Sequence, residues 1–434
     1  DKHRAYLQKL LDGGHAYYDY TPRERLDELR EQAQREGRMF VFRQSLISPA
    51  EMEQYKAAGH PAVIRFRVPE EGSTGFDDLV YGRIEVAHSS IGDFVIARGD
   101  GTPLFLFSNA VDDADMRITH VCRGEDHVPN TPKQILLYRA MGLPVPQFAH
   151  LPMILGSDRQ KLSKRHGAVR VMQFREEGIL AAALVNFLAL LGWAPEGAET
   201  EEVMTIEELI ARFSLDRVNK SPAVFDYEKL HWMNGVYIRK MPKEDLAAEV
   251  LPRVRAAYPE VEILDPAGRN RTLPVEDWLR AVLDLLVERS RTLNDFAPAM
   301  DFFFRAPTEY EEKGMKKVLS TPEQVALLGE VRDVIARAWD EAGPGGNPLV
   351  IEPDGRYAAP GTGRVDLPKQ MEQVVRSWTE QRGVKLGNAL QPVRLALTGR
   401  TASPPLFEII LLLGREETLR RIDALRERAA KTVA

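Results

Sequence analysis

The chain contains 434 residues, which is too long for one compact core and predicts two to four domains. Apolar residues make up 44% and charged residues 28%, an ordinary globular composition, and the net charge of −6 confines any nucleic-acid contact to local basic surfaces. The single cysteine, Cys122, excludes a disulfide framework and a multi-thiolate zinc site, while the lack of a membrane-length apolar run and of a signal-peptide pattern favours a cytoplasmic protein.

The first part of the chain combines charged helices with short strands. DKHRAYLQKLLDGGHAYYDY predicts a helix that Gly13–Gly14 ends, and RERLDELREQAQREG indicates further helix between residues 20 and 60. PAVIRFRVP (61–69) alternates apolar and basic residues, as a half-buried strand does. LVYGRIEV, DFVIAR and PLFLFS predict further strands between residues 80 and 125, with Gly-Asp and Asp-Gly turns between them.

The segment that follows predicts a strand leading into a helix. The strand MRITHVC ends in polar RGEDHVPNTP, which runs into the helix KQILLYRAMG. Thr131 or Asn130 is a candidate cap of that helix, and Pro132 suits its first turn. Ligands in α/β folds bind at the carboxyl ends of strands. The polar segment is therefore a candidate ligand site.

Helices dominate after residue 175. ILAAALVNFLALLGW has a helical apolar face, EELIARF and EKLHWMNGVYIRKM follow it, and no strand is predicted between residues 240 and 434. The Gly/Pro-rich stretch 340–363 is typical of a mobile surface insertion. The predicted fold class is therefore α/β in the first part of the chain and all-α in the second.

The loop GSDRQKLSKRHG (156–167) carries five basic side chains, two lysines, two arginines and a histidine, in a chain whose net charge is acidic. Lys161 and Lys164 lie three residues apart with Ser163 between them, and the flanking glycines allow backbone N–H groups to approach a ligand closely. Because a lysine ammonium is a point charge on a long stem, the pattern suits a mobile phosphate clamp. A solvated basic turn is the alternative, and composition alone does not separate the two.

Four blocks in chain order carry a resemblance to a known family. KLSKR resembles the KMSKS-type signature of class I aminoacyl-tRNA synthetases, and its context FAHLPMILGSDRQKLSKRHGA resembles bacterial-type glutamyl-tRNA synthetases. The other blocks are VDDADMRITHVCRGEDHVPNTPKQILLYRAMG, FDYEKLHWMNGVYIRKM, and GVKLGNALQPVRLALTG with PPLFEIILLLG. Together they indicate the family more strongly than one short motif does.

The resemblance implies an incomplete class I Rossmann-type nucleotide fold with an inserted acceptor-binding domain, followed by helical stem-contact and anticodon-binding domains. We expect a remnant of the first Rossmann half, the acceptor-binding insertion, the second Rossmann half with the KLSKR loop, the stem-contact domain and the anticodon-binding domain at residues 1–18, 19–104, 105–175, 176–240 and 241–434. Some family members hold zinc through a Cys-x-Cys pair in the acceptor domain. Here AYYDYTP replaces that pair, so we predict no zinc.

In that family, the second lysine of the loop steadies the α-phosphate and the departing pyrophosphate while the adenylate forms. The resemblance assigns this role to Lys164, with Lys161 and Ser163 shaping the loop and Arg165 contributing to ATP binding. Such a loop stabilises the charge that develops during attack at phosphorus. ATP and Mg²⁺ are the expected cofactors, and the chemistry requires no protein nucleophile.

The resemblance also implies a glutamate pocket. Arg123 matches the position that reads the substrate's side-chain carboxylate, a position that is not arginine in glutaminyl enzymes. A guanidinium can grip a carboxylate with two parallel hydrogen bonds, which lysine cannot imitate. An ion pair of Arg123 with Glu125 or Asp126 is the alternative.

Five further residues belong to the same implied site. Asn109 matches the pocket asparagine, and Phe105 falls where the family commonly has a tyrosine, so one polar contact of about 1 kcal/mol or somewhat more is lost. His127 falls where a ring would wall the site, although a hydrogen-bonded histidine at a helix start is an equal alternative. Asp112 and Asp113 match an acidic pair near the substrate and the tRNA acceptor end, and in isolation would be an ordinary turn.

Anticodon recognition requires arginines or polar groups that meet splayed bases. Arg394 lies at a family position for anticodon contact, and Arg289 and Arg376 align with two others; a solvated helix face is the alternative for each. Residues 371–434 carry eleven Lys/Arg against seven Asp/Glu, the local excess that an RNA-binding surface predicts.

One feature of the class is missing, because no HxGH motif occurs in the chain. A chain that starts inside its nucleotide fold explains this, and a natural truncated paralogue that binds tRNA without charging it is the rival. The resemblance implies a ligase that joins L-glutamate to tRNA(Glu) with ATP through a glutamyl-adenylate. We expect it to be a cytoplasmic monomer without membrane contact.

Overall fold

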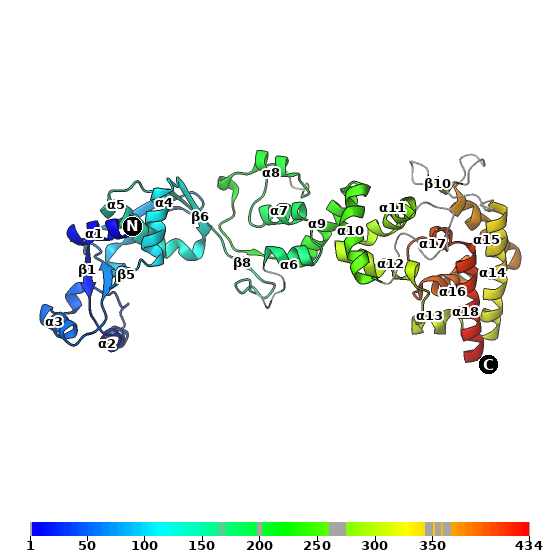
Figure 1. Ribbon diagram of the computed structural model, residues 1–434, viewed down its shortest axis with the longest axis horizontal. Coiled ribbons are helices and arrows are strands. Elements are labelled where there is room, and N and C mark those ends of the chain that lie inside the picture. The colour runs from blue at the N-terminus through cyan, green and yellow to red at the C-terminus, as the bar shows by residue number, and fades with distance from the viewer. Residues whose placement is uncertain are drawn as a thin grey trace. The chain divides into compact units, whose positions relative to one another are not determined.

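The computed structural model (Figure 1) describes residues 2–163, 165, 167, 170–197, 202–259, 275–342, 350–351, 357–358 and 366–433. The chain divides into two compact units. Unit 1 comprises residues 1–167 and 188–225, and unit 2 comprises residues 168–187 and 226–434. None of the described helices is both long enough and apolar enough to cross a membrane.

Unit 1 begins with the predicted helix and a three-stranded antiparallel sheet. Helix α1 (Lys2–Asp12) ends at Gly13, and Gly14 adopts a φ of +70°, a left-handed conformation that glycine adopts without strain. The sheet has the order β1-β2-β5, formed by β1 (Ala16–Asp19), β2 (Val63–Phe66) and β5 (Phe94–Arg98). The strands predicted from PAVIRFRVP and DFVIAR are thus confirmed.

The charged segment between residues 20 and 60 is helical, as predicted. It forms α2 (Arg23–Arg35) and α3 (Pro49–Ala57). Ser48 caps α3 through a capping box with Glu51, in which each side chain bonds the other residue's backbone N–H. A small cluster of Leu29, Phe42 and Ile47 anchors this helical region.

A second sheet of unit 1 has the order β4-β3-β7-β6. Strands β3 (Ser73–Asp78) and β4 (Gly82–Ala87) are antiparallel, whereas β7 (Gln147–Leu151) is parallel to both β3 and β6 (His120–Gly124). The carboxyl ends of three neighbouring parallel strands therefore lie at one edge. Sequence analysis missed β3 because its residues, STGFDD, are mostly polar or small.

The strand predicted from PLFLFS is wrong, because these residues begin helix α4 (Phe105–Asp115). Phe107, Ala110 and Val111 are buried at the i, i+3, i+4 spacing of a helix face. The six residues PLFLFS are too few to show this repeat, because Ala110 and Val111 lie beyond them. The correction matters for the site because it places Phe105 and Asn109 one helical turn apart.

The strand-to-helix segment is confirmed in outline. A 3₁₀ turn, η3 (Glu125–Asn130), connects β6 to helix α5 (Thr131–Met141), and Pro132 lies in the first turn as predicted. The predicted cap is wrong, because no side chain makes a capping hydrogen bond there. Unit 1 also contains α8 (Ile206–Arg212) and the short parallel pair of β8 (Ile154–Leu155) and β9 (Ala223–Val224).

Unit 2 is helical. Its first helices are α6 (Val171–Glu176), α7 (Ala181–Leu190), which extends past the unit boundary, α9 (Tyr227–Lys240), α10 (Lys243–Ala257), α11 (Val275–Leu286) and α12 (Phe296–Phe304). They are followed by α13 (Glu312–Val318), α14 (Pro322–Ala342), α15 (Leu367–Arg382), α16 (Leu386–Thr398), α17 (Leu406–Leu413) and α18 (Arg415–Val433). In Figure 1, α14 packs beside α15 and α18.

The core of unit 2 joins helices that are distant in sequence. Trp278 on α11 is buried and donates its indole N–H to the carbonyl of Leu412 on α17 at 3.1 Å. Among the described residues after 240, the predicted helical texture is confirmed except at the two-residue strands β10 (Val350–Ile351) and β11 (Tyr357–Ala358). Most of the stretch 340–363 lies outside the described residues, so its mobility stays a prediction.

Candidate active site

The candidate site lies at the carboxyl ends of β6 and β7 in unit 1. Arg123 on β6 is in register with His150 on β7, so both side chains project from the same face of the sheet. Arg123 Nε donates to His150 Nε2 at 3.2 Å, and Nη2 donates to the Thr131 hydroxyl at 2.7 Å. The guanidinium carbon also lies 5.6 Å from the centroid of the Phe148 ring. The half-buried guanidinium is therefore fixed along one edge.

A buried carboxylate lies behind His150. Asp78, the last residue of β3, accepts hydrogen bonds from His150 Nδ1 at 2.6 Å and from the backbone N–H groups of Val80 and Tyr81 at 3.0 and 2.9 Å. Burial alone would raise the pKa of Asp78, but these hydrogen bonds outweigh it and hold the pKa below its ordinary value. Burial lowers the pKa of His150 more than Asp78 raises it, so the ring is neutral near neutral pH.

The alternative ion pairs of Arg123 are not formed within the described part of the chain. Glu125 instead accepts from the Tyr81 hydroxyl at 2.5 Å, and Asp126 pairs with a lysine of the basic loop. Burial lowers the pKa of Arg123, and the nearby charge of Asp113 on α4 opposes the shift. Arg123 thus remains a cation without a directly bound carboxylate.

Helix α4 contributes one wall. Phe105, Asn109 and Asp113 follow one another at intervals of four residues and so lie along one face of the helix. Asn109 Oδ1 accepts a hydrogen bond from Gln134 Nε2 of α5 at 2.7 Å. The Phe105 ring is 58% exposed, and its centroid lies 6.0 Å from that of His127. The predicted pocket residues Phe105 and His127 are therefore brought together.

His127 is also hydrogen-bonded at the start of a helix, as its alternative interpretation required. Its Nδ1 lies 3.2 Å from Asn130 Nδ2 in η3. The same ring faces Phe105, so the two interpretations of His127 are compatible. Asp112, the other acidic candidate on α4, lies 2.9 Å from His3 Nε2 of α1 and is largely exposed.

The first part of the basic loop forms a tight hairpin. Gly156 N–H donates to the Gln160 carbonyl at 2.8 Å, and Leu162 N–H donates to the Ile154 carbonyl at 3.0 Å. The N–H of one of the two flanking glycines is thus used inside the hairpin. Lys161, the residue after Gln160, extends its ammonium to Asp126 Oδ2 at 3.1 Å.

This ion pair connects the loop to the end of β6. Both side chains are exposed, so the pair contributes little to stability. Ser163 follows Lys161 by two residues in the chain. Farther along the loop, Arg165 Nη2 lies 3.4 Å from Asp158 Oδ2. Lys164 lies outside the described residues, so its role stays a prediction.

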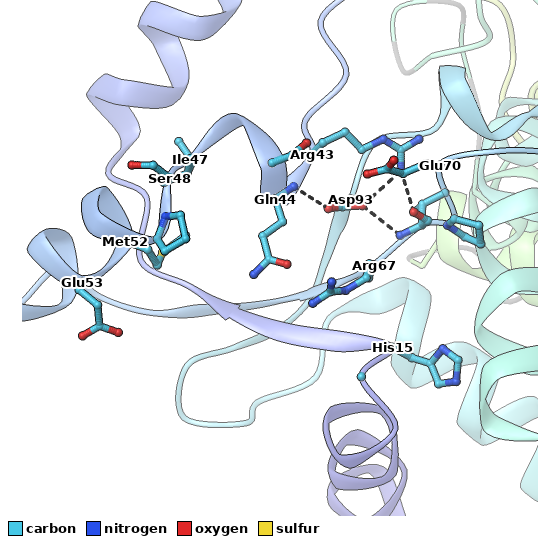
Figure 2. Close-up of a pocket in the computed structure, with 15 residues that line it drawn as sticks. His15, Arg43, Gln44, Ile47, Ser48, Met52, Glu53, Arg67, Glu70 and Asp93 are labelled. Carbon is cyan, nitrogen blue, oxygen red and sulfur yellow. Dashed lines mark hydrogen bonds and ion pairs between the residues drawn. The ribbon is translucent and has the colours of Figure 1, made fainter.

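A separate cavity of about 1050 Å³ lies among the helices and strands of residues 14–93 (Figure 2). The buried Asp93 carboxylate organises one wall by accepting from the backbone N–H groups of Gln44 and Val68, each at 2.9 Å, and by pairing with Arg43 at 3.3 Å. The side chains of Gln44 and Arg67 point into the open space in Figure 2.

In unit 2, Arg394 on α16 is held by neutral oxygen atoms. Its Nη1 donates to the carbonyls of Ser403 and Pro404 at 3.1 and 2.9 Å and contacts the Ser403 hydroxyl. Burial lowers the pKa of Arg394, and the positive charge of nearby Arg289 lowers it further. Arg289 and Arg400 line a cavity of about 130 Å³ together with Ser403 and Pro404. Two of the three predicted arginines, Arg394 and Arg289, are therefore neighbours.

The third predicted arginine, Arg376, is exposed on α15 and pairs with Glu372 at 2.7 Å, one helical turn away. Much of the basic excess in residues 371–434 is likewise neutralised by carboxylates, in the pairs Arg382–Glu330, Arg415–Asp340, Arg420–Glu417, Arg421–Glu417 and Arg426–Asp423. Arg394 differs from these residues, because its described hydrogen-bond partners are neutral and its neighbouring charge is that of Arg289.

Sequence reasoning missed the residues that hold the predicted ones in place. His150 sits within a buried strand, and a polar residue in the apolar run FAHLPM was the available signal. Thr131 was considered only as a helix cap. Asp78 and Gln134 gave no signal, because their partners are 72 and 25 residues away along the chain.

Comparisons with known proteins agree with this arrangement. The family of class I tRNA synthetases (E and Q), catalytic domain, matches residues 1–232, and the anticodon binding domain family matches residues 245–343 and 367–426. The fold is accordingly that of a class I aminoacyl-tRNA synthetase, with a catalytic domain followed by a helical anticodon-binding domain.

Individual relatives narrow the family further. Glutamate–tRNA ligase 1 of Caldanaerobacter subterraneus subsp. tengcongensis is 38% identical over 435 residues, covering 100% of this chain and 82% of its own length. Glutamate–tRNA ligase of Symbiobacterium thermophilum is 41% identical, covering 97% of this chain and 81% of its own length. The chain belongs to the glutamate–tRNA ligase family.

A solved structure gives the same result. The glutamate tRNA ligase from Elizabethkingia meningosepticum, crystallised in complex with its amino acid, superposes with a TM-score of 0.76 at 28% identity. The match covers 98% of this chain and 82% of that one. The family resemblance of the four sequence blocks is therefore confirmed.

Proposed function

We propose that the site around Arg123 carries the glutamate-recognition step of a ligase that joins glutamate to tRNA with ATP. The observation that supports this most directly is the unequal use of the two edges of the guanidinium. His150 and Thr131 take the edge formed by Nε and Nη2, whereas no described residue hydrogen-bonds to Nη1. The edge formed by Nη1 and the second N–H of Nη2 therefore offers two parallel N–H donors to a side-chain carboxylate of glutamate.

The neighbouring side chains complete the proposed pocket. Asn109, held by Gln134, offers its amide to the amino acid, while Phe105 and His127 form an aromatic wall. A neutral glutamine side chain would leave the buried charge of Arg123 uncompensated, which favours glutamate. A tRNA-binding protein without ligase activity, the rival considered from the sequence, would have no use for this arrangement.

We propose that the basic loop binds the phosphates of ATP through Lys161, Lys164 and Arg165, with Ser163 shaping the loop. The ion pair of Lys161 with Asp126, at the end of β6, supports a position beside the glutamate pocket. Mg²⁺ would enter with the nucleotide, because Mg²⁺ is usually held by phosphate oxygens and only one or two carboxylates. Among the described residues, no group of three or more His, Cys, Asp or Glu side chains could enclose a metal ion.

For tRNA we propose two separate contact regions. The cavity lined by Gln44 and Arg67 supports an acceptor-binding role for residues 19–104, and Asp112 would lie toward the same acceptor end. Arg394 and Arg289, together with Arg376, would contact the anticodon of tRNA(Glu). Phosphate oxygens and splayed bases suit such clustered guanidinium groups.

The remaining assignments are extensions of the family membership. We propose the domain boundaries 1–18, 19–104, 105–175, 176–240 and 241–434, a monomeric protein and a cytoplasmic location. The absence of zinc from the acceptor region stays a prediction.

The test of the proposed function is Arg123→Ala in the full-length protein. Loss of the guanidinium should abolish glutamate charging, lowering kcat/KM by about a thousandfold or more, because a buried site loses its charge complement. Arg139→Ala, an exposed arginine on α5, is the matched control and should charge normally. Near-normal charging by Arg123→Ala would remove the glutamate pocket from this site.

A further inference from the structure

Three residues from three neighbouring parallel strands form one hydrogen-bonded chain behind the proposed glutamate pocket. Asp78 lies on β3, His150 on β7 and Arg123 on β6. His150 is 0% exposed and Asp78 is 4% exposed, so water does not compete for these bonds. The strand register therefore aligns a buried carboxylate, an imidazole and a guanidinium in a fixed order.

The hydrogen-bond directions determine the state of the imidazole. Because Arg123 Nε can only donate, His150 Nε2 must be the unprotonated nitrogen. The ring proton is then on Nδ1, where it is donated to Asp78 at 2.6 Å. Backbone N–H groups of Val80, Tyr81 and His150 fix the carboxylate itself. Asp78 thus selects the tautomer that can accept a hydrogen bond from Arg123.

The His150 imidazole separates Arg123 from the carboxylate of Asp78, and this separation has a chemical consequence for Arg123. A carboxylate in direct contact with the guanidinium would neutralise it and compete with a ligand carboxylate for the same donors. His150 and Thr131 fix the Nε and Nη2 edge with neutral acceptors instead. The guanidinium is held in place and still presents its charge to the ligand.

We infer that Asp78 and His150 are positioning residues that orient Arg123 and thereby set the affinity for the side-chain carboxylate of glutamate. The inference rests on the proposed role of Arg123 in binding that carboxylate. It adds two residues, neither of which touches the substrate. The same arrangement explains why a buried Asp–His pair lies at this sheet edge.

Two substitutions of His150 separate the contact of Nδ1 with Asp78 from the contacts of Nε2, where the Thr131 hydroxyl lies at 3.0 Å beside Arg123. In His150→Asn the short amide can reach Asp78 but not Arg123, so the KM for glutamate should rise about tenfold, as expected for the loss of a hydrogen bond to a charged group. In His150→Gln the longer amide places a carbonyl near the former Nε2 and should restore part of that affinity. The KM values for ATP and tRNA should change less than about threefold in both variants.

The matched control is His88→Asn. His88 is a second buried histidine of unit 1 that bonds Thr74 at 2.9 Å and the Glu71 carbonyl at 2.7 Å, away from Arg123. This variant should lose thermal stability but keep its KM for glutamate. A selective effect of His150→Asn beyond that control separates positioning from a general packing role.

Arg123→Lys, measured in parallel, distinguishes the possible failures. An increased glutamate KM in Arg123→Lys with an unchanged KM in His150→Asn would overturn the positioning inference alone. Unchanged KM values in both would overturn the proposed function as well. If His150→Asn does not fold, Asp78→Asn decides: we expect a rise of about threefold in the glutamate KM, and an unchanged value overturns the inference.

Discussion

Arg123 in the catalytic unit and Arg394 in the helical unit are anchored in the same way by different partners. Both guanidinium groups are partly buried, and neither has a carboxylate within 4.0 Å among the described residues. Arg123 is held by an imidazole and a hydroxyl, and Arg394 by two backbone carbonyls and a hydroxyl. In each case neutral acceptors fix the side chain without cancelling its charge.

Arg421 on α18 shows the opposite arrangement. It is 1% exposed, donates to the carbonyls of Phe302 and Leu397 at 2.6 and 2.7 Å, and pairs with Glu417 at 2.7 Å. Its charge is therefore cancelled within the core. The comparison indicates that the partner of a buried arginine, more than its burial, separates a binding residue from a structural one.

The two regions differ in what an anchored arginine is proposed to meet. Arg123 faces a small anion and needs one defined orientation, which side chains on three adjacent strands provide. Arg394 lies next to Arg289, so two like charges gather where a polyanion would compensate both. Substitutions at Arg123 and in the basic loop should therefore change amino-acid and ATP kinetics, and substitutions at Arg394 and Arg289 should change tRNA affinity.

Lys164→Ala in the basic loop should give the largest difference between the effect on charging kinetics and the effect on tRNA affinity. We expect kcat for charging to fall by about a hundredfold to a thousandfold, because the lysine would stabilise charge that develops only as the adenylate forms. The Kd for tRNA should change less than about threefold. Steady-state charging rates and filter binding of tRNA measure the two quantities. Equal losses of both would mean that the lysine only holds RNA.

Arg394→Ala should have a smaller effect, and it should change tRNA affinity and not glutamate kinetics. The Kd for tRNA should rise about tenfold while the KM for glutamate stays unchanged, because the lost contact is to RNA. Arg382→Ala is the matched control, since Arg382 is exposed and paired with Glu330 at 2.9 Å. Filter binding and charging assays on the same preparations test this division.

Arg421→Leu tests whether Arg421, in contrast to Arg394, stabilises the fold and does not bind tRNA. The buried Glu417 would keep only its pair with Arg420, and the carbonyls of Phe302 and Leu397 would lose their donor, so the free energy of unfolding should fall by about 3 kcal/mol. The loss should appear in chemical denaturation without a selective change in tRNA affinity at a temperature where the variant is folded. A selective loss of tRNA binding would place Arg421 with Arg394 and break the distinction between them.

The catalytic region should also respond to pH. Since burial lowers the pKa of His150, with Asp78 opposing and Arg123 and His127 adding to the effect, the ring stays neutral until the pH falls below the ordinary value of about 6.5. Protonation would then place a proton on Nε2 and remove the acceptor of Arg123. The glutamate KM should rise severalfold on this acid side, and the stability contributed by the neutral ring should be lost in the same direction.

The groups that face His150 define the controls for this profile. Asp78 on β3 has a lowered pKa and stays ionised in this range, and Arg123 on β6 stays charged. His127 in η3 is the other titratable neighbour, so His127→Gln should retain the acid rise. His150→Gln should flatten it. A profile that is unchanged in His150→Gln would assign the titration to another group.

Sequence patterns were sufficient for residues whose role is expressed locally. The polar strand end at Arg123 and the basic loop were visible as candidate sites because each lies within a few residues, whereas the roles of Arg123 and the lysines came from the family resemblance and stay predictions. The helix α4 could not be identified from PLFLFS, because its apolar repeat begins only with Phe107 and Ala110. Asp78 and His150 depend on the register of β3, β7 and β6, which no local spacing encodes.

The smallest predicted change concerns the aromatic wall of the pocket. Phe105 occupies the first position of α4 and is 58% exposed, with its ring 6.0 Å from that of His127. In Phe105→Tyr the added hydroxyl extends into the pocket and gains one hydrogen bond to the bound amino acid. The KM for glutamate should fall about threefold to tenfold, corresponding to about 1 kcal/mol.

Phe213→Tyr is the matched control for that substitution. Phe213 is 48% exposed in unit 1, and its ring centroid lies 5.4 Å from that of Trp193, outside the proposed pocket, so its new hydroxyl should meet water and leave the glutamate KM unchanged. Combining Phe105→Tyr with His150→Asn then tests whether the two act on the same ligand. Additive changes in the free energy of glutamate binding are expected if the hydroxyl contacts the amino acid independently of Arg123, whereas loss of the Phe105→Tyr gain in the double variant would mean that Arg123 must first orient the substrate.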